Sequence, residues 1–228
     1  MGEIKVKDKE IVVPGQELAT GMDFLPGGAA FREGEKIIAS QLGLISVRGK
    51  VIRLIPLTGK YVPKVGDIII GRIIDMNFNG WVVDIGCSYD AVLSIRSVQE
   101  YVERDDDLTK YYSFNDIVVT KITKITRSKL IDLTTKGPGL MKLVGGNIIE
   151  VTPSKVPRVI GKQGSMIDMI KKMTNCRITV GQNGRVWIQG DIKNTLIATK
   201  AIRKIERESH TPGLTDKIKE LLEKETKK

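Results

Sequence analysis

The chain has 228 residues, of which 41% are hydrophobic, and a formal net charge of +10. The hydrophobic share is enough for packed cores, which excludes wholesale disorder, and no apolar run approaches the ~18 residues of a membrane span, so no membrane insertion is expected. The two cysteines, Cys87 and Cys176, lie far apart and accompany a single histidine, which argues against a disulfide framework or a metal site and favours a reducing cytoplasm.

Residues 1–64 are predicted to form a small, mainly β N-terminal domain. Short β-type runs at residues 11–13, 36–40, 44–47 and 50–56 are separated by turn residues, and no helical period persists. The glycine-rich residues 26–31 lack the spacing of a nucleotide-binding loop, so they predict tight turns. Pro, Gly and Asp cluster in residues 61–67, which indicates a domain boundary before the next strand.

Residues 65–136 carry five short β-type runs, at residues 68–76, 80–85, 91–95, 116–125 and 129–133. An acidic, helix-prone segment interrupts them after the third run. Five short strands with one insert favour a small closed barrel of the OB type. Gly-Asp before the first strand, the pattern G-x-I-x-D within it and a last strand reading I-D-L-T resemble an S1 RNA-binding domain.

The predicted barrel offers few rings for stacking on bases. Phe78 and Trp81 are the obvious candidates, and Ser94 stands where S1 domains that bind RNA on the barrel face usually carry a histidine. Stacking contributes ~1–3 kcal/mol per base, so a face this poor in rings predicts a weak grip. Trp81 fits the barrel core equally well.

A basic cluster marks the last two predicted strands of the barrel. Lys121, Lys124 and Arg127 are candidate RNA contacts, and Lys129 follows them. Strand parity places Lys121 and Lys124 on opposite faces, so the cluster cannot all share one surface, and a solvated loop remains an alternative. The acidic run at residues 105–107 has no histidine partner and indicates a solvated loop in preference to a metal site.

After a Gly-Pro-Gly linker, residues 145–210 are predicted to form an α+β domain that holds most of the positive charge. Residues 145–207 contain 12 Lys and Arg against 4 Asp and Glu, whereas residues 65–136 contain 9 against 11. Such a concentration favours a polyanionic partner. The expected order is strand, helix, Gly-x-x-Gly, helix, a hairpin with Asn183-Gly184 at its turn, and a final helix.

This order resembles a type I KH domain, whose Gly-x-x-Gly loop clamps single-stranded nucleic acid. Two glycines leave the loop backbone open to close approach, and the amides that begin the next helix can face phosphate. The predicted RNA-binding residues of the loop and its approach are Arg158, Ile160, Gly161, Lys162, Gln163 and Gly164.

Residues 211–228 are predicted to form a C-terminal amphipathic helix. Leu214, Ile218, Leu221 and Leu222 lie at helical spacing and form one apolar stripe. The stripe needs a partner, which is either the body of the same chain or another subunit.

The multidomain order of N-terminal β unit, S1 barrel and KH domain resembles the RNA-binding cap subunit of the archaeal exosome. The sequences VVPG at residues 12–15, PLTGKYVP at 56–63 and VGDIIIG at 65–71 carry this resemblance. A related cap subunit has a zinc ribbon in place of the KH domain. The two cysteines of this chain exclude that subunit.

This resemblance implies three cap copies on a hexameric ring of ribonuclease PH-like subunits. The N-terminal domain would dock on the ring, and the S1 domains would surround its entrance. The subunit would capture single-stranded RNA 3′ ends, with some preference for adenine-rich RNA, and deliver them for phosphorolysis inside the ring.

The residues themselves show no catalytic constellation. No Ser/His/Asp set, no carboxylate cluster with a metal partner and no phosphate-binding loop occurs, so we expect neither an enzyme nor a cofactor. The alternative is an S1/KH RNA chaperone or translation-associated RNA-binding protein, which would have no need of a ring-docking domain.

Overall fold

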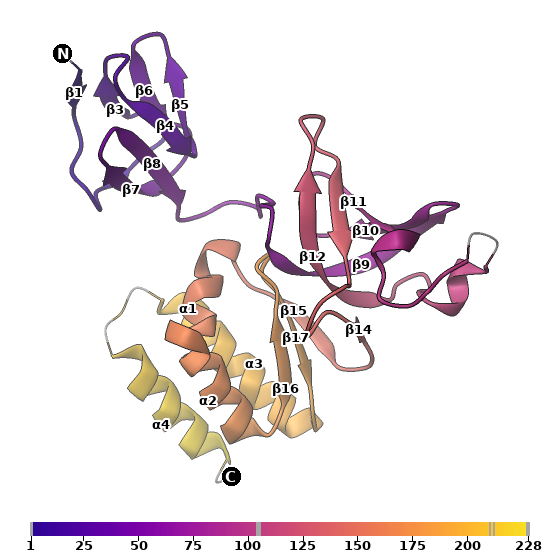
Figure 1. The fold of residues 1–228 in the computed structure, drawn as a ribbon. Helices are drawn as coiled ribbons and strands as arrows, with labels where there is room; N and C mark the ends of the chain where they lie inside the picture. The colour runs from indigo at the N-terminus through magenta and orange to yellow at the C-terminus, as the bar shows by residue number, and fades with distance from the viewer. Residues whose placement is uncertain (1, 104–105, 210, 212, 227–228) are drawn as a thin grey trace. The chain divides into compact units, whose positions relative to one another are not determined.

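The computed structural model describes residues 2–103, 106–209, 211 and 213–226 of the chain. These residues fall into two compact units that divide between Gly59 and Lys60, and Figure 1 traces the chain through both. The first unit is the N-terminal β domain, and the second contains the barrel, the KH domain and the C-terminal helix.

Two four-stranded sheets make up the N-terminal unit, which confirms that it is mainly β. The first sheet has the order β1-β3-β6-β5, and the second has the order β2-β7-β8-β4. Their bounds are β1 Glu3–Ile4, β2 Ile11–Val12, β3 Glu17–Thr20, β4 Leu25–Gly28, β5 Ala30–Glu33, β6 Lys36–Ala39, β7 Gly43–Arg48 and β8 Val51–Pro56. Val12, Leu18, Ile37, Ile45 and Leu54 are fully buried in the core of the unit.

Within the glycine-rich residues 26–31, only Ala29 is in a turn, and the residues on either side of it belong to β4 and β5, so the prediction of tight turns is wrong except at Ala29. Strand β4 pairs in parallel with β8, and Gly28 lies opposite Leu54. Gly28 has φ +67°, and a Cβ there would lie 2.2 Å from the carbonyl oxygen of Leu54. Glycine has a low strand propensity, but a partner distant in sequence supplies the pairing, and only a glycine fits so close to it.

The second unit begins with a closed barrel of five strands, as predicted. The strands are β9 Ile68–Asn77, β10 Gly80–Asp84, β11 Ala91–Ser94, β12 Ile117–Ile125 and β13 Ile131–Thr134. Closure follows because β13 pairs in parallel with β11 and antiparallel with β12, which in turn pairs with β9. A short strand, β14 Lys142–Leu143, pairs antiparallel with the start of β12. Tyr61 packs into the barrel core beside Ile69 and Leu133.

The segment between β11 and β12 contains no α-helix among its described residues. Two single-turn 3₁₀ helices occur instead, η1 Ile95–Ser97 and η2 Leu108–Lys110. Of the acidic run, Asp105 lies outside the described residues, and Asp107 accepts a hydrogen bond from the amide of Thr109 at 3.0 Å, which caps η2. No group of three metal-ligating side chains occurs in the described part of the chain.

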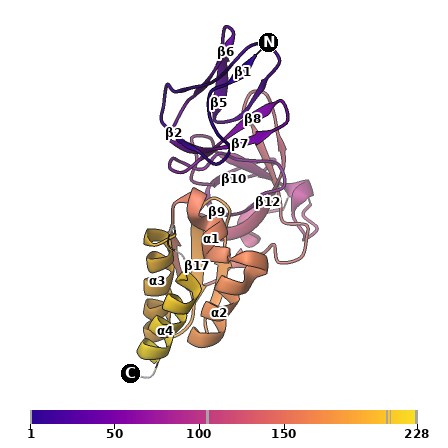
Figure 2. The ribbon, with the colours of Figure 1, turned by 90° about the vertical axis from the view of Figure 1, so that its left-hand side faces the viewer.

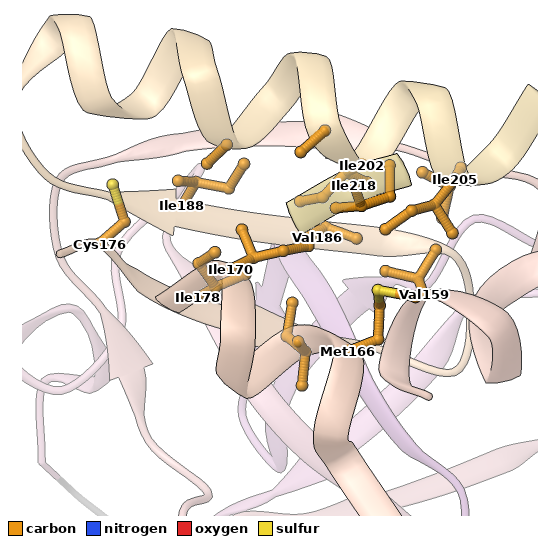
Figure 3. Packing of buried hydrophobic residues seen from close by; sticks show 14 of the residues in the cluster. Val159, Met166, Ile170, Cys176, Ile178, Val186, Ile188, Ile202, Ile205 and Ile218 are labelled. Atoms are coloured by element: carbon orange, nitrogen blue, oxygen red, sulfur yellow. The ribbon is translucent and has the colours of Figure 1, made fainter. Parts of the chain in front are cut away.

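The KH domain has the predicted order of elements. They are β15 Asn147–Glu150, η3 Pro153–Lys155, α1 Val156–Ile160, η4 Lys162–Gly164, α2 Ser165–Thr174, β16 Arg177–Val180, β17 Arg185–Gln189 and α3 Ile192–Arg207. The antiparallel sheet has the order β15-β17-β16, and Figure 2 shows it beside the helices. One face of the sheet packs on the helices through Ile178, Val186 and Ile188, as Figure 3 shows.

The C-terminal helix, α4 Leu214–Thr226, packs on its own chain. Leu214, Ile218 and Leu222 are fully buried in the KH core, and the helix lies against α2 and α3. Figure 3 shows Ile218 beside Ile202 of α3. Of the two partners that the sequence left open for this stripe, the structure selects the body of the same chain.

Candidate nucleic-acid interface

The Gly-x-x-Gly loop has a backbone that only glycine can adopt at its first position. Gly161 ends α1 with φ +78° and ψ 174°, a region that is essentially restricted to glycine. A Cβ at Gly161 would lie 2.6 Å from the Cβ of Met166 and 2.7 Å from its amide nitrogen. Met166 is itself buried in the core, so the contact cannot easily relax. The chain therefore turns tightly onto the first turn of α2.

The two central residues of the loop are exposed. Lys162 and Gln163 both lie in solvent at the start of α2, and Gln163 has φ +54°. Gly164, the N-cap of α2, is left-handed, and no side chain caps the helix. Uncapped amides at a helix N-terminus carry partial positive charge, and the Lys162 ammonium adds a full one. This arrangement suits a phosphate group.

Two further predicted residues precede the loop on α1. Arg158 is exposed, and its Nη2 donates a hydrogen bond to the carbonyl oxygen of Thr211 at 3.2 Å. Ile160 is half-buried and packs against the KH core. Arg158 therefore lies beside the loop, but part of its hydrogen-bonding capacity goes to the segment between α3 and α4.

The hairpin turn between β16 and β17 is inserted against the barrel. Asn183 is buried, and its Nδ2 donates to the carbonyl oxygens of Ile70 at 2.8 Å and Ile85 at 2.9 Å, while its Oδ1 accepts from the amide of Ile70 at 3.2 Å. Gln182 exchanges two hydrogen bonds with the backbone of Ile68, each 2.8 Å long. The turn is hydrogen-bonded to the start of β9 and to Ile85 just after β10, so these side chains are committed to protein contacts.

The turn is flanked by Gly181 and Gly184, because the backbones of Ile70 and Val151 lie too close to these positions for a larger residue. A Cβ at Gly181 would lie 2.8 Å from the amide nitrogen of Ile70, and one at Gly184 would lie 2.2 Å from the carbonyl oxygen of Val151. The sequence predicted the hairpin correctly from Asn183-Gly184. It did not show that this turn forms the contact between the KH domain and the barrel. A glycine on each side of Gln182-Asn183 was the available signal.

An ion pair and an apolar patch complete the contact between barrel and KH domain. Arg185 pairs with Asp84 at 2.5 Å. Trp187 packs on Ile70 and Val119 of the barrel, and its Nε1 donates to the carbonyl oxygen of Gly145 at 2.7 Å. The KH sheet therefore packs on helices with one face and on the barrel with part of the other, where Arg177 and Glu150 stay exposed. The face that holds the Gly-x-x-Gly loop remains exposed to solvent.

Of the two predicted stacking residues on the barrel, only Phe78 is exposed. Trp81 is fully buried, donates from Nε1 to the carbonyl oxygen of Tyr112 at 3.0 Å, and packs edge-on against the Tyr112 ring with centroids 5.1 Å apart. The prediction of Trp81 as an RNA-binding residue is therefore wrong, because its ring belongs to the barrel core. Phe78, in the turn between β9 and β10, is 86% exposed.

The basic cluster is arranged differently from the prediction by parity. A β-bulge at Thr123 shifts the register, so Lys121 lies opposite Thr134 and Lys124 lies opposite Asp132. Ile122 and Leu133 between them point into the core, which leaves both lysines exposed on the outer face. The prediction that Lys121 and Lys124 lie on opposite faces is therefore wrong. Arg127 is exposed in the turn that follows.

Barrel, KH loop and N-terminal β unit together define a multidomain RNA-binding protein of the S1–KH class. Three family models agree: "Exosome RNA binding protein RRP4 N-terminal domain" matches residues 9–58, "RRP4, S1 domain" matches 60–105, and "KH domain" matches 146–194. The chain belongs to the Rrp4 family of exosome complex components, which are non-catalytic RNA-binding subunits.

Archaeal relatives are similar along nearly the whole chain. The exosome complex component Rrp4 of Pyrococcus horikoshii is 49% identical and covers 97% of this chain and 85% of its own. Its counterpart in Methanothermus fervidus is 45% identical, with 95% and 96% coverage. A crystal structure assigned provisionally to an exosome complex RNA-binding protein is 34% identical, with a TM-score of 0.66, and covers 74% of this chain and 98% of that one.

No helix in the described ranges is both long and apolar enough to cross a membrane.

Proposed function

We propose that this chain is the cap subunit of a cytoplasmic exosome. The cap captures single-stranded RNA 3′ ends. It passes them to a hexameric ring of ribonuclease PH-like subunits that degrade RNA from 3′ to 5′, with three cap copies on each ring. The N-terminal β domain docks on the ring, while the S1 barrel and the KH domain hold RNA. Adenine-rich RNA is the preferred substrate class.

The exposed Gly-x-x-Gly loop carries this proposal. Lys162 and Gln163 stand in solvent at an uncapped helix N-terminus, in the domain that carries most of the positive charge of the chain. A site that contacts the sugar-phosphate backbone binds RNA without recognising every base. Binding of this kind suits a subunit that must accept many RNA sequences.

The N-terminal domain favours an exosome cap over an RNA chaperone. Its 58 described residues form a separate compact unit with its own core, and its sequence matches the exosome family model. A chaperone built from S1 and KH modules has no need of this unit.

Co-purification of the full chain from a native extract tests the proposal. The expected partners are ribonuclease PH-like subunits, retained at moderate salt and after nuclease treatment. Recovery of ribosomal subunits alone would instead support the translation-associated alternative. A second measurement compares RNA degradation by the ring with and without the chain, and we expect the cap to lower the RNA concentration needed for half-maximal rate.

A further inference from the structure

Helix α3 presents one continuous line of exposed side chains to solvent. Its inner side packs into the KH core through Ala198, Ile202 and Ile205, and its 16 residues give it a length of about 24 Å. The exposed residues follow one another at helical spacing, and we call them the α3 stripe: Ile192, Lys193, Leu196, Lys200, Arg203 and Arg207. The stripe is apolar at its start and basic along the rest, and it contains no acidic residue.

The apolar start of the stripe consists of two large aliphatic side chains in adjacent turns. Ile192 is 84% exposed and Leu196 is 58% exposed. Among the described side chains of α2 and α4, by contrast, every exposed one is polar or charged. A single exposed aliphatic residue is ordinary, but a pair in adjacent turns of one helix, on a helical layer that is otherwise polar outside, indicates a surface that a partner covers.

The basic part of the stripe is not neutralised by its own chain. Lys193 and Arg207 take part in no ion pair between described residues. Lys200 and Arg203 each have one carboxylate within 3.5 Å, but these are exposed pairs, which contribute little and exchange partners readily. The stripe is therefore complementary to a partner that carries carboxylates.

The chemistry of the stripe distinguishes between three kinds of occupant. A second copy of the chain is disfavoured, because two stripes packed face to face bring cations against cations. RNA is disfavoured, because the stripe has no aromatic ring on which a base can stack. An acidic amphipathic helix fits both parts at once, since its apolar side chains cover Ile192 and Leu196 while its carboxylates meet the cations of the following turns.

We propose that the α3 stripe binds an acidic amphipathic helix of a partner protein. This goes beyond the proposed function, because neither RNA capture at the loop nor docking through the N-terminal domain uses α3. In Figure 2, α3 lies on one side of the helical layer, and α2, which begins at the Gly-x-x-Gly loop, lies on the other. Loop and stripe can therefore be occupied together, so that a protein bound at α3 stands beside RNA held by the cap.

Fluorescence anisotropy with the full chain and a labelled helical peptide tests the apolar part. The peptide carries Leu in two adjacent turns and Glu at the same side of the following turns. Ile192→Ser combined with Leu196→Ser should weaken its binding at least about tenfold, because two aliphatic contacts are lost. Met141→Ser combined with Val144→Ser is the matched control, since both residues are exposed and lie outside α3. It should leave the affinity unchanged.

Charge substitutions test the basic part with a predictable sign. Lys193→Glu combined with Lys200→Glu should weaken binding of the acidic peptide, most strongly at low salt, and should strengthen binding of a peptide that has Lys in place of Glu. Lys217→Glu combined with Lys224→Glu makes the same change of charge at exposed positions of α4 and should do neither to a similar extent. Equal effects of the two charge variants, or a parent chain that binds the acidic peptide no better than the basic one, would overturn the proposal.

Photo-cross-linking identifies the natural occupant. The full chain with p-benzoylphenylalanine in place of Leu196 is irradiated in a native extract, and the same substitution at Thr215, exposed on α4, is the control. The expected product joins position 196 to a protein segment with Asp or Glu at helical spacing, and Lys193→Glu combined with Lys200→Glu should abolish it. Cross-links to RNA alone, to a second copy of the chain, or to the same proteins as the control position overturn the proposal. So does a loss of RNA binding or of ring association in Ile192→Ser combined with Leu196→Ser, because the stripe would then belong to the function already proposed.

Discussion

Arg185 of the KH domain forms two hydrogen bonds with Asp84 of the barrel. Its Nη2 lies 2.5 Å from Oδ2 of the Asp84 carboxylate, and its Nη1 donates to the carbonyl oxygen of the same residue at 2.7 Å. The arginine side chain is 11% exposed and the aspartate side chain is 33% exposed. Strand β17 is thereby tied to β10 by a partly buried ion pair, which is costly to break by removing one partner.

This pair should make the contact between the domains sensitive to acid. Burial alone raises the pKa of Asp84, but the hydrogen bonds from Arg185 and the Gly86 amide outweigh it and hold the pKa below the usual 3.8. A lowered pKa contributes stability that is complete above the unfolded value and is lost as the pH falls through the folded value. The contribution of Asp84 should therefore persist at pH 5 to 7 and decline below about pH 3.8.

Urea unfolding of the parent and of Asp84→Asn between pH 7 and pH 3 measures this contribution. The variant should be less stable at pH 7, and the difference should shrink as the pH falls below the usual carboxyl pKa. Asp90→Asn, at an exposed position of the same barrel, controls for the loss of one carboxylate. A stability difference for Asp84→Asn that stays constant at every pH would show that its ionisation is not coupled to folding.

The second prediction concerns Asn183. Replacement by Ala leaves two carbonyl oxygens and one amide of the barrel without their partner, which should destabilise the chain by about 2–4 kcal/mol. Asn183→Asp should cost at least as much, because it directs a carboxylate at two carbonyl oxygens. Gln182→Ala removes one side-chain hydrogen bond at an exposed position and should cost less than about 1 kcal/mol.

The unfolding curve distinguishes the role of Asn183 further. If Asn183 holds barrel and KH domain together, its loss should split one transition into two, since domains that lose their contact unfold separately. Near-parent stability of Asn183→Ala, with a single transition, would show that Arg185 and the Trp187 patch suffice.

The parts predicted from the sequence are those set by local patterns. Helix α2 follows from the spacing of Met166, Ile167 and Ile170, all three of which are buried, and the five-stranded barrel follows from short runs separated by turn residues. In each case a local period or a turn signal decides the element. Packing in the final fold reinforces that signal without changing it.

The parts that the sequence missed depend on partners distant in the chain. The β-bulge at Thr123 reverses the parity that would separate Lys121 from Lys124, and no local signal marks it. Trp81 is buried because Tyr112, 31 residues away, packs on its ring and accepts from its Nε1. Asn183 has the sequence of an ordinary hairpin turn, and only its contact with Ile70 makes it part of an interface.

The third prediction compares the two glycines of the KH loop. Gly161→Ala should destabilise the domain by about 2 kcal/mol or more, because it combines a glycine-only backbone with a 2.6 Å approach to Met166. At Gly164 a Cβ meets only Asp168 Oδ2 at 3.6 Å, so the left-handed backbone is the main cost, about 1 kcal/mol. Hydrogen exchange of the α2 amides should speed up more in Gly161→Ala. Equal effects of the two substitutions would contradict the close contact at Met166.

The fourth prediction tests the loop as a phosphate-binding site. Lys162→Asp combined with Gln163→Asp retains both glycines, and aspartate tolerates the left-handed backbone at position 163. Both side chains are exposed, so stability should change by no more than ~0.5 kcal/mol. The substitutions replace one positive charge with two negative ones beside the helix N-terminus. RNA affinity should therefore fall, most strongly at low salt where screening is weak.

Salt dependence separates a lost phosphate contact from general repulsion. Loss of one contact should flatten the log–log slope of single-strand binding by ~0.7. Lys193→Asp combined with Asn194→Asp, on the helix that follows the hairpin, makes the same change of charge in the same domain. That control changes the net charge equally but leaves the loop unaltered. It should therefore weaken binding less and leave a steeper slope than the loop variant. If the loop variant and its control behave alike at every salt concentration, the loop contributes only to the field of the domain, and the S1 barrel carries the RNA.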